Sequence, residues 1–249
     1  MKGTTPAGTT PGDGLTEQEA SAWVRGMFGR VAHRYDLANH LLSLNIDRYW
    51  RARTVKRVRD TLCAPGAKAL DLCCGTGDLL LALEACRGGA VWGSDFCHPM
   101  LTAAAEKIAR RGFHSTLFES DALRIPVCDG SFDLVTVAFG FRNLANYAHG
   151  LDEMRRVLRP GGMAAILEFS QPPNPWFAAL YNFYSRRVLP AVGCALSGSK
   201  DAYTYLPESV RKFPAPEELA ANMRQAGFAD VTFERLTGGI VCLHRGRAQ

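Results

Sequence analysis

The sequence predicts an α/β fold in which a mostly parallel seven-stranded sheet carries helices on both faces. Short apolar runs alternate with helical patterns from residue 67 to residue 169, which is typical of a doubly wound sheet. The composition, 47% apolar and 21% charged over 249 residues, is that of a folded soluble protein with a sizeable core. The apolar runs are too short and too interrupted to span a bilayer.

Each expected strand is a short apolar or alternating run, and each expected helix has apolar residues at three- and four-residue spacing. The helix expected over 99–112 has Pro99 at its start and Gly112 after its end, whereas the helix over 149–162 ends in Pro-Gly-Gly. The other two expected helices span residues 76–86 and 216–227. The expected strands span residues 67–73, 90–96, 115–120, 132–139, 163–169, 230–236 and 239–246.

The segment before the first strand is expected to form a helical lead-in. Its apolar residues from Trp23 to Val31 recur at helical spacing, and the lead-in spans residues 16–62 after a disordered tail at 1–15. Residues 23–59 carry nine arginines and lysines against two aspartates, while the whole chain has a net charge of +5. A basic helical segment is a solvated face, a nucleic-acid contact or a contact with an anionic membrane.

Residues 171–214 interrupt the alternation, and we expect them to form a helical cap inserted into the fold. The aromatic-rich part at 173–196 favours helix, and a loop is expected at 197–216. The lead-in, the sheet and the cap are expected to make one domain from residue 16 to residue 249.

The eight cysteines and six histidines form no pattern typical of a redox or zinc site, and no metal is expected. We interpret the adjacent Cys73 and Cys74 as small residues packed at the end of a buried strand. The first twenty residues lack the apolar stretch of a secretory signal, so a cytoplasmic location is expected.

The stretch LDLCCGTGDLL, residues 70–80, places Gly75 and Gly77 between an expected strand and an expected helix. At such a junction the bare backbone can approach a ligand, and the N-terminus of the helix faces it. Leu80 stands where a dinucleotide-binding fingerprint needs its third glycine, and the Gly-Lys-Ser/Thr of an ATP-binding loop is absent. Two glycines alone are also compatible with a tight structural turn.

Acidic residues accompany three successive expected strands. Asp95 ends the second, where a carboxylate can accept two hydrogen bonds from ribose hydroxyls. Asp121 and Ala122 follow the third, placed to meet an adenine edge with a side-chain acceptor and a backbone N–H. This layout is typical of a pocket for S-adenosylmethionine, which carries no phosphate and needs no lysine at the glycine turn. The alternative is that Asp95 only caps the helix that follows it.

Longer stretches of the sequence are distinctive: YDLANHLLSLNIDRYWR (35–51), FGFRN (139–143), RVLRPGGMAAILEFS (156–170), YNFYSRRVLP (181–190), YLPESVRKFP (205–214) and LTGGIVCLHRG (236–246). Together with Asp71–Asp78, Asp95 and Asp121, they resemble the class I S-adenosylmethionine-dependent methyltransferases, which have a Rossmann-like fold. Within that class they resemble the ubiquinone/menaquinone biosynthesis C-methyltransferase family. The likeness runs from about Val31 to Gly246.

The resemblance implies the cofactor S-adenosylmethionine, the product S-adenosylhomocysteine, and methyl transfer to a ring carbon of a lipophilic prenylated quinol, in the first place demethylmenaquinol. Thr76 and Asp78 are expected to hold the methionine end of the cofactor or to cap the helix, and Asp71 to reach the methionine ammonium. The family pattern has Met, His and often Ser where Ala38, Asp47 and Ala138 stand; alanine at 138 removes one polar cofactor contact of roughly 1 kcal/mol. The expected cofactor-binding residues are Asp71, Gly75, Thr76, Gly77, Asp78, Asp95, Phe96, Asp121, Ala122 and Ala138.

Methyl transfer to a ring carbon needs a phenolate, because a neutral aromatic carbon is a poor nucleophile. Arg142, after the fourth strand, is expected to stabilise this oxyanion or an activated water, with Asn143 as a second candidate. The alternative is an exposed loop arginine in a salt bridge. Tyr35 and Asp36 are expected to close over the substrate from the lead-in, where Asp36 or His33 would take the phenolic proton.

The aromatic cap suits a lipophilic ring and tail, and with basic residues 25–59 it indicates transient contact with the inner, anionic face of a membrane. A homodimer is compatible with the sequence. Methylation of RNA or DNA bases is disfavoured, because the Asn/Asp-Pro-Pro-aromatic motif of amino-methylating enzymes is missing after the fourth strand. No nucleic-acid partner is therefore expected. A catalytically silent scaffold of a quinone-biosynthesis complex and another small-molecule methyltransferase remain as alternatives.

Overall fold

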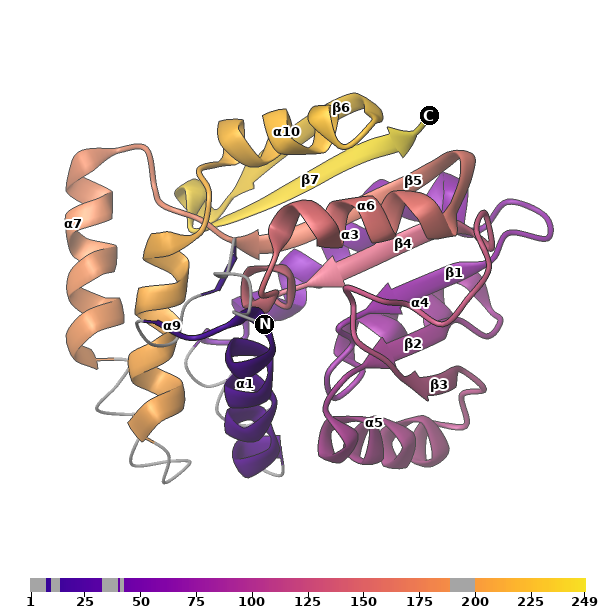
Figure 1. Ribbon diagram of the computed structural model, residues 1–249, viewed down its shortest axis with the longest axis horizontal. Helices are drawn as coiled ribbons and strands as arrows, with labels where there is room; N and C mark the ends of the chain where they lie inside the picture. Colours follow the sequence, from indigo (N-terminus) through magenta and orange to yellow (C-terminus); the bar gives the residue numbers. More distant parts are fainter. Residues whose placement is uncertain (1–7, 10–13, 33–39, 41–42, 189–199) are drawn as a thin grey trace.

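The structure is a computed structural model that describes residues 8–9, 14–32, 40, 43–188 and 200–249. Its centre is a seven-stranded sheet built from β1 (Ala69–Leu72), β2 (Trp92–Asp95), β3 (Thr116–Glu119), β4 (Phe132–Ala138), β5 (Leu158–Phe169), β6 (Phe228–Leu236) and β7 (Val241–Ala248). The strand order is β3-β2-β1-β4-β5-β7-β6 (Figure 1). Strands β1 to β5 are parallel, whereas β7 pairs antiparallel with β5 and β6. The predicted mostly parallel seven-stranded sheet is confirmed.

Helices cover both faces of the sheet because successive strand residues point to opposite sides and both sides are apolar. On one face, Leu70 and Val135 pack against α6 (Tyr147–Val157) and α10 (Pro216–Gln225). On the other face, Leu134 packs with α3 (Ile46–Leu62) and α4 (Asp78–Arg87). Figure 1 shows α6 in front of the sheet and α3 behind it. Helix α5 (His98–Arg111) covers β2 and β3, with proline in its first turn and a glycine C-cap, as predicted.

Helix α1 (Glu17–Val31) begins the lead-in, and α3 follows it. Thr16 and Glu19 form a capping box that satisfies backbone N–H groups at the start of α1. Tyr205 packs on the buried face of α1, which also contacts α5. Three predicted site residues, His33, Tyr35 and Asp36, lie outside the described residues.

The cap contains α7 (Pro175–Phe183), the π-helical turn η3 (Tyr184–Val188) and α9 (Lys200–Lys212). The loop predicted for residues 197–216 is therefore wrong, because α9 occupies most of it. Helical geometry buries Tyr205 and Val210. Burial of these side chains outweighs the backbone hydrogen bond that Pro207 cannot donate inside the helix.

The helix predicted over 149–162 is too long at its C-terminal end. Helix α6 ends at Val157 and β5 begins at Leu158, so the Pro-Gly-Gly stretch lies in the strand. The pairing register with β4 shifts at this point, and Gly161 has a φ of +78°. An irregular strand start of this kind accommodates glycine and proline that regular pairing would reject.

Candidate active site

A cavity of about 530 Å³ lies at the carboxyl ends of β1, β2 and β4, where open α/β sheets bind their ligands. Residues from the loops after these strands, from α3 and from the cap line it. The predicted site residues that line it are Asp71, Gly75, Thr76, Asp78, Asp95, Phe96, Asp121, Ala122, Ala138, Arg142 and Asn143. Gly77 is the one described member of the predicted set outside this lining.

The glycine turn, residues 73–77, adopts a left-handed backbone at three positions. Cys73, Gly75 and Gly77 have φ angles of +53°, +55° and +85°. Gly77 packs against α5, where an added Cβ would lie 3.3 Å from the Cβ of Ala104. Glycine at 77 is therefore required by backbone conformation and close helix packing rather than by a contact in the cavity.

Cys73 and Cys74 are free thiols, and burial raises the pKa of both well above the ordinary value. Such thiols are poor nucleophiles because little thiolate is present near neutral pH. The raised pKa of both thiols agrees with the interpretation of Cys73 and Cys74 as packing residues.

Gly140, after β4, lies against the glycine turn, and a Cβ added there would overlap the Cβ of Cys73. We expect Gly140→Ala to lower the free energy of unfolding by about 1–3 kcal/mol, because overpacking forces the two loops apart. Cys73→Gly removes the overlapping atom and suits the positive φ, so the double variant should regain most of this loss. Urea unfolding of the wild type, both single variants and the double variant measures the effect. If Gly140→Ala lowers the free energy of unfolding equally in the wild type and in the Cys73→Gly variant, overlap with the Cβ of Cys73 is not the cause of the loss.

Asp95 is buried at the end of β2 and organises the backbone around the cavity. Its carboxylate accepts the N–H of Gly75 at 2.9 Å and the N–H of Cys97 at 2.9 Å. Burial raises its pKa to about 6, although these backbone hydrogen bonds oppose the shift. Cys97, rather than Asp95, holds the N-cap position of α5. The helix-cap alternative for Asp95 is therefore wrong.

Asp71 is more deeply buried, with 1% of its surface exposed. It pairs with Thr136 across β1 and β4, and the Thr136 hydroxyl donates a hydrogen bond of 2.7 Å to its carboxylate. Burial raises the pKa of Asp71 to about 7, although the hydrogen bond from Thr136 acts to lower it. Among the described residues, neither Asp71 nor Asp95 forms an ion pair, so the cavity wall holds two desolvated carboxylates.

Thr76 and Asp78 are held by Lys107 of α5. The Lys107 ammonium donates to the Thr76 hydroxyl at 3.1 Å and to the Asp78 carboxylate at 2.8 Å. Gly77 is the N-cap of α4, so neither Thr76 nor Asp78 holds that position, and no side-chain capping bond is formed there among the described residues. The cap alternative for Thr76 and Asp78 is wrong, while both remain in the cavity wall.

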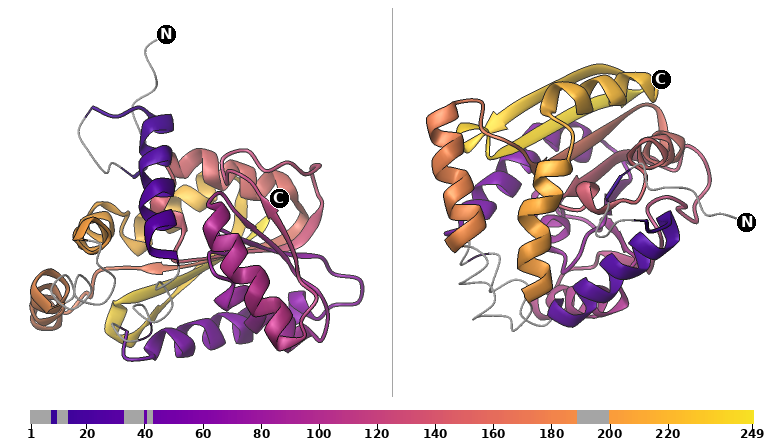
Figure 2. Two further views of the ribbon diagram at one scale, coloured as in Figure 1. Left: turned by 90° about the horizontal axis from the view of Figure 1, so that it is seen from below. Right: turned by 60° about the vertical axis from the view of Figure 1, so that its left-hand side comes forward.

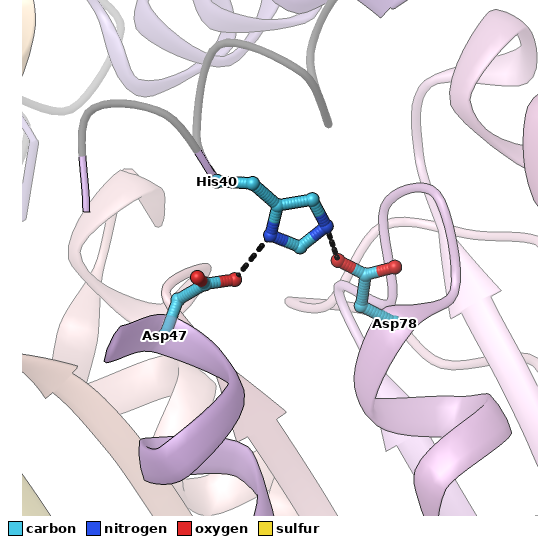
Figure 3. A group of neighbouring side chains, drawn as sticks. All are labelled: His40, Asp47 and Asp78. Carbon is cyan, nitrogen blue, oxygen red and sulfur yellow. Dashed lines mark hydrogen bonds and ion pairs between the residues drawn. The ribbon is translucent and has the colours of Figure 1, made fainter. Parts of the chain in front are cut away.

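A charged cluster joins the lead-in to the glycine turn. His40 lies between two carboxylates, with Nδ1 2.7 Å from Asp47 and Nε2 3.6 Å from Asp78 (Figure 3). The ligating atoms of these three residues lie within 4.8 Å of one another, which is a spacing that a metal site could use. Arg51 pairs with both carboxylates, and Lys107 pairs with Asp78. These cations already neutralise the cluster and disfavour a metal there.

Arg142 is 4% exposed and forms a buried ion pair with Glu168 of β5. Its Nη1 donates to the Glu168 carboxylate at 2.9 Å and also to the Phe139 carbonyl, and its backbone N–H donates to Glu168 at 3.1 Å. The alternative of an exposed loop arginine in a salt bridge is therefore wrong about the exposure, whereas the salt bridge that it expected is present. Sequence reasoning missed Glu168, although a carboxylate at the carboxyl end of a buried strand was the available signal.

Asn143 contacts the cap. Its side-chain oxygen accepts a hydrogen bond of 3.1 Å from the Tyr205 hydroxyl of α9, which lies 2.5 Å from the Thr9 hydroxyl. Burial raises the pKa of Tyr205. Tyr205 was also missed, because its segment was predicted as a loop.

The remaining wall of the cavity is aromatic and apolar. The rings of Phe139 and Phe169 lie 4.7 Å apart, and Trp50 packs 5.8 Å from Phe139. From the cap, α7 and η3 contribute Phe177, Leu180, Tyr181 and Tyr184. The cavity thus has a carboxylate-bearing wall at the sheet edge and an aromatic wall beneath the cap.

The family model of the ubiE/COQ5 methyltransferase family matches residues 15–248 of this chain. This protein belongs to that family. It is 49% identical to the demethylmenaquinone methyltransferase of Thermus thermophilus, over 88% of this chain and 99% of the relative. It is 40% identical to the ubiquinone/menaquinone biosynthesis C-methyltransferase UbiE of Bdellovibrio bacteriovorus, over 90% and 94% of the two chains. A solved S-adenosylmethionine-dependent methyltransferase from Thermotoga maritima shares the fold, with a TM-score of 0.62 at 18% identity over 90% and 99% of the chains.

As a ubiE/COQ5 family member, the protein is an S-adenosylmethionine-dependent methyltransferase with the predicted Rossmann-like fold. The cavity fits this cofactor. Buried Asp71 and Asp95 suit an ammonium group and ribose hydroxyls, since an ammonium group and hydroxyl donors stabilise carboxylates that form no ion pair among the described residues. Asp121 and Ala122 lie in the lining after β3, as an adenine contact requires.

Cofactor binding by this methyltransferase should strengthen as pH rises. Burial raises the pKa of Asp95 to about 6 and the pKa of Asp71 to about 7, whereas an ordinary aspartate has a pKa of 3.8. Between these pH values the folded protein without cofactor therefore binds more protons than the unfolded chain does. As pH rises from about 4 to about 7, ionisation of Asp71 and Asp95 therefore lowers the free energy of unfolding of the cofactor-free protein. A bound ligand that carries a cation or hydroxyl groups instead favours the ionised carboxylates, so its binding releases these protons. The dissociation constant of S-adenosylhomocysteine should fall by up to about tenfold per pH unit for each proton released.

Calorimetric titration of S-adenosylhomocysteine, from about pH 5 to about pH 8 in buffers of different ionisation enthalpy, counts the released protons. Asp71→Asn should reduce that count, because asparagine has no proton to release. If the dissociation constant of S-adenosylhomocysteine does not change between about pH 5 and about pH 8, the cofactor does not bind to Asp71 and Asp95 in the expected way.

Proposed function

We propose that this methyltransferase transfers a methyl group to a ring carbon of a prenylated quinol, converting demethylmenaquinol to menaquinol. The observation that carries the proposal is the lining of the cavity, which combines buried carboxylates, aromatic rings, Arg142 and Asn143. The guanidinium of Arg142 lies 5.4 Å from the centroid of the Phe169 ring. An aromatic wall suits a lipophilic ring better than it suits a charged acceptor. The name of the Thermus thermophilus relative supports the same acceptor, and the name of the Bdellovibrio bacteriovorus relative covers both ubiquinone and menaquinone biosynthesis.

In this proposal the sheet-edge wall binds the cofactor. Asp95 accepts hydrogen bonds from the ribose, while Asp121, Ala122 and Phe96 surround the adenine. The glycine turn and Asp71 hold the methionine end, and Ala138 gives a contact without a polar group. S-adenosylmethionine supplies an electrophilic methyl group when it is bound.

Arg142 and Asn143 are assigned to the acceptor. Deprotonation of a ring hydroxyl puts negative charge on the ring and makes the ortho carbon nucleophilic. When this carbon takes the methyl group, the methyl–sulfur bond breaks, and the carbon then loses its own hydrogen as a proton, which restores the aromatic ring. The guanidinium of Arg142 stabilises this phenolate electrostatically, and the low exposure of Arg142 strengthens the interaction. Tyr35 and Asp36, outside the described residues, stay assigned to closing over the acceptor and to proton removal.

The acceptor is expected to come from a membrane. Among the described residues, no helix has the length and apolar character to cross a bilayer. We assign transient contact with an anionic surface to basic residues 25–59, in which Arg53 and Arg57 are paired with Glu234, while Arg25, Arg48, Lys56 and Arg59 are exposed. A cytoplasmic, peripheral location and a homodimer remain parts of this proposal.

The proposal is tested with purified protein, S-adenosylmethionine and two reduced short-chain acceptors, a demethylmenaquinol and a demethylated ubiquinol precursor. Mass spectrometry of the products shows which ring is methylated. We expect a methylated naphthoquinol that forms only from the reduced acceptor. Methylation of the benzoquinol alone would overturn the choice of ring. Cofactor binding without product from either acceptor would favour another small-molecule substrate or a scaffold.

A further inference from the structure

Helix α7 has two apolar sides. Phe177, Leu180 and Tyr181 line the cavity, whereas Trp176 and Phe183 do not. Trp176 is 86% exposed, Leu180 64% and Phe183 62%, so large apolar side chains also face solvent at three- and four-residue spacing. No charged residue occurs between residues 169 and 185. Exposed apolar side chains gathered on one short helix usually mark an interaction surface.

This helix stands at the edge of the molecule and beside the cavity. Figures 1 and 2 show α7 as the outermost element, with α9 next to it. Leu180 is both exposed and part of the cavity lining, so the exposed side of α7 continues into the cavity. Leu44 and Ile46, at the start of α3, have the same double character and are 74% and 36% exposed. Both exposed apolar groups therefore belong in part to the cavity lining.

We propose that Trp176, Leu180 and Phe183 of α7, together with Leu44 and Ile46, form a surface that inserts into the interface of an anionic lipid bilayer. The inference deepens the proposed function and rests on it for the lipophilic acceptor, which would enter the cavity directly from the bilayer. A tryptophan in such a surface suits the boundary between headgroups and acyl chains.

Charge and size favour a bilayer over a second protein. Exposed Arg48 and Arg187 follow the two apolar groups in the chain, and cations at this position attract anionic headgroups. The apolar side chains on a nine-residue helix offer much less than the roughly 800 Å² per partner of a standard protein interface. The surface thus suits shallow insertion, with the basic residues adding electrostatic attraction.

The test uses the full-length protein and vesicles of phosphatidylcholine with phosphatidylglycerol, in which some phosphatidylcholine is brominated. Bromine quenches tryptophan fluorescence over short distances, so lipids brominated near the headgroup should quench the wild type. Trp176→Phe keeps an apolar ring and should lose most of the quenching. The double variant Trp176→Ser/Phe183→Ser, which leaves the cavity lining intact, should bind the vesicles at least about tenfold more weakly.

Activity gives a second, independent measurement. The double variant should keep wild-type turnover with a water-soluble acceptor that lacks the prenyl tail, whereas its KM for a vesicle-embedded acceptor should rise. Absence of quenching, or equal vesicle binding by the double variant and the wild type, would overturn the inference. Sedimentation that shows a wild-type dimer broken by these substitutions would assign the surface to a second copy and would also overturn it. Vesicle binding without methylation of any quinol would refute the proposed function alone, and methylation without vesicle binding would refute this inference alone.

Discussion

Replacing Arg142 by methionine is expected to lower the turnover number for quinol methylation by about 10²–10³-fold, the usual loss when one preorganised group is removed from a developing oxyanion. The guanidinium belongs to the cavity wall and is fixed by Glu168 at 2.9 Å and by the Phe139 carbonyl. It therefore needs little rearrangement when charge develops on the ring. Affinity for S-adenosylhomocysteine should hardly change, because none of the assigned cofactor contacts is made by the Arg142 side chain. Steady-state kinetics and calorimetry measure these two quantities separately.

A stability loss must be separated from this catalytic loss. Arg142→Met leaves the 1% exposed carboxylate of Glu168 without its cation, which should cost roughly 3–5 kcal/mol of unfolding free energy. The double variant Arg142→Met/Glu168→Gln removes both charges, so it should recover much of that stability and still turn over slowly. Recovery of turnover in the double variant would mean that Arg142 only neutralises Glu168, and the catalytic assignment would then be wrong.

The order of strands and helices could be predicted because each element carries a local signal. Strand β1 is a short run buried on both faces, and α5 has proline in its first turn and glycine after its last. Helix α9 lacks such signals, since Pro207 interrupts its pattern and the apolar contacts that favour it come from other parts of the fold. The place of β7 between β5 and β6 likewise depends on pairing, which a local pattern does not specify.

The position of the site was predictable from the turn and the acidic residues, since parallel strands bring their carboxyl ends to one edge. The pairing of its side chains was not. Arg142 and Glu168 are 26 residues apart, and Lys107 of α5 reaches Asp78 at the start of α4, 29 residues away and across strand β2 in the chain. Such pairs depend on tertiary packing, so the sequence indicates that these charged residues are present and the structure shows what each contacts.

Asp95→Ala is expected to weaken binding of S-adenosylhomocysteine by about 10²–10⁴-fold, since two hydrogen bonds to a charged group contribute about 1.5–3 kcal/mol each. Asp95 lies at the carboxyl end of β2 in the cavity wall. Burial already raises its pKa to about 6, so a ligand that donates hydrogen bonds relieves an unfavourable charge as it binds. Calorimetric titration of S-adenosylhomocysteine measures the change.

Glu119 offers a matched control, because it is the register partner of Asp95 on β3 but lies outside the cavity lining. The charge of Glu119 helps to raise the pKa of Asp95, so the comparison is made at about pH 8, where Asp95 is ionised. There Glu119→Ala should leave the dissociation constant close to that of the wild type. Asp95→Asn removes the negative charge and keeps one oxygen that can accept the N–H of Gly75, while its amide nitrogen cannot accept the N–H of Cys97. Urea unfolding of this variant shows whether the loss at Cys97 disturbs the fold. If the ribose is bound through charge-assisted hydrogen bonds, Asp95→Asn should weaken binding nearly as much as Asp95→Ala. If Asp95 only holds the glycine turn in place, the asparagine variant should bind like the wild type, and the ribose assignment would be wrong.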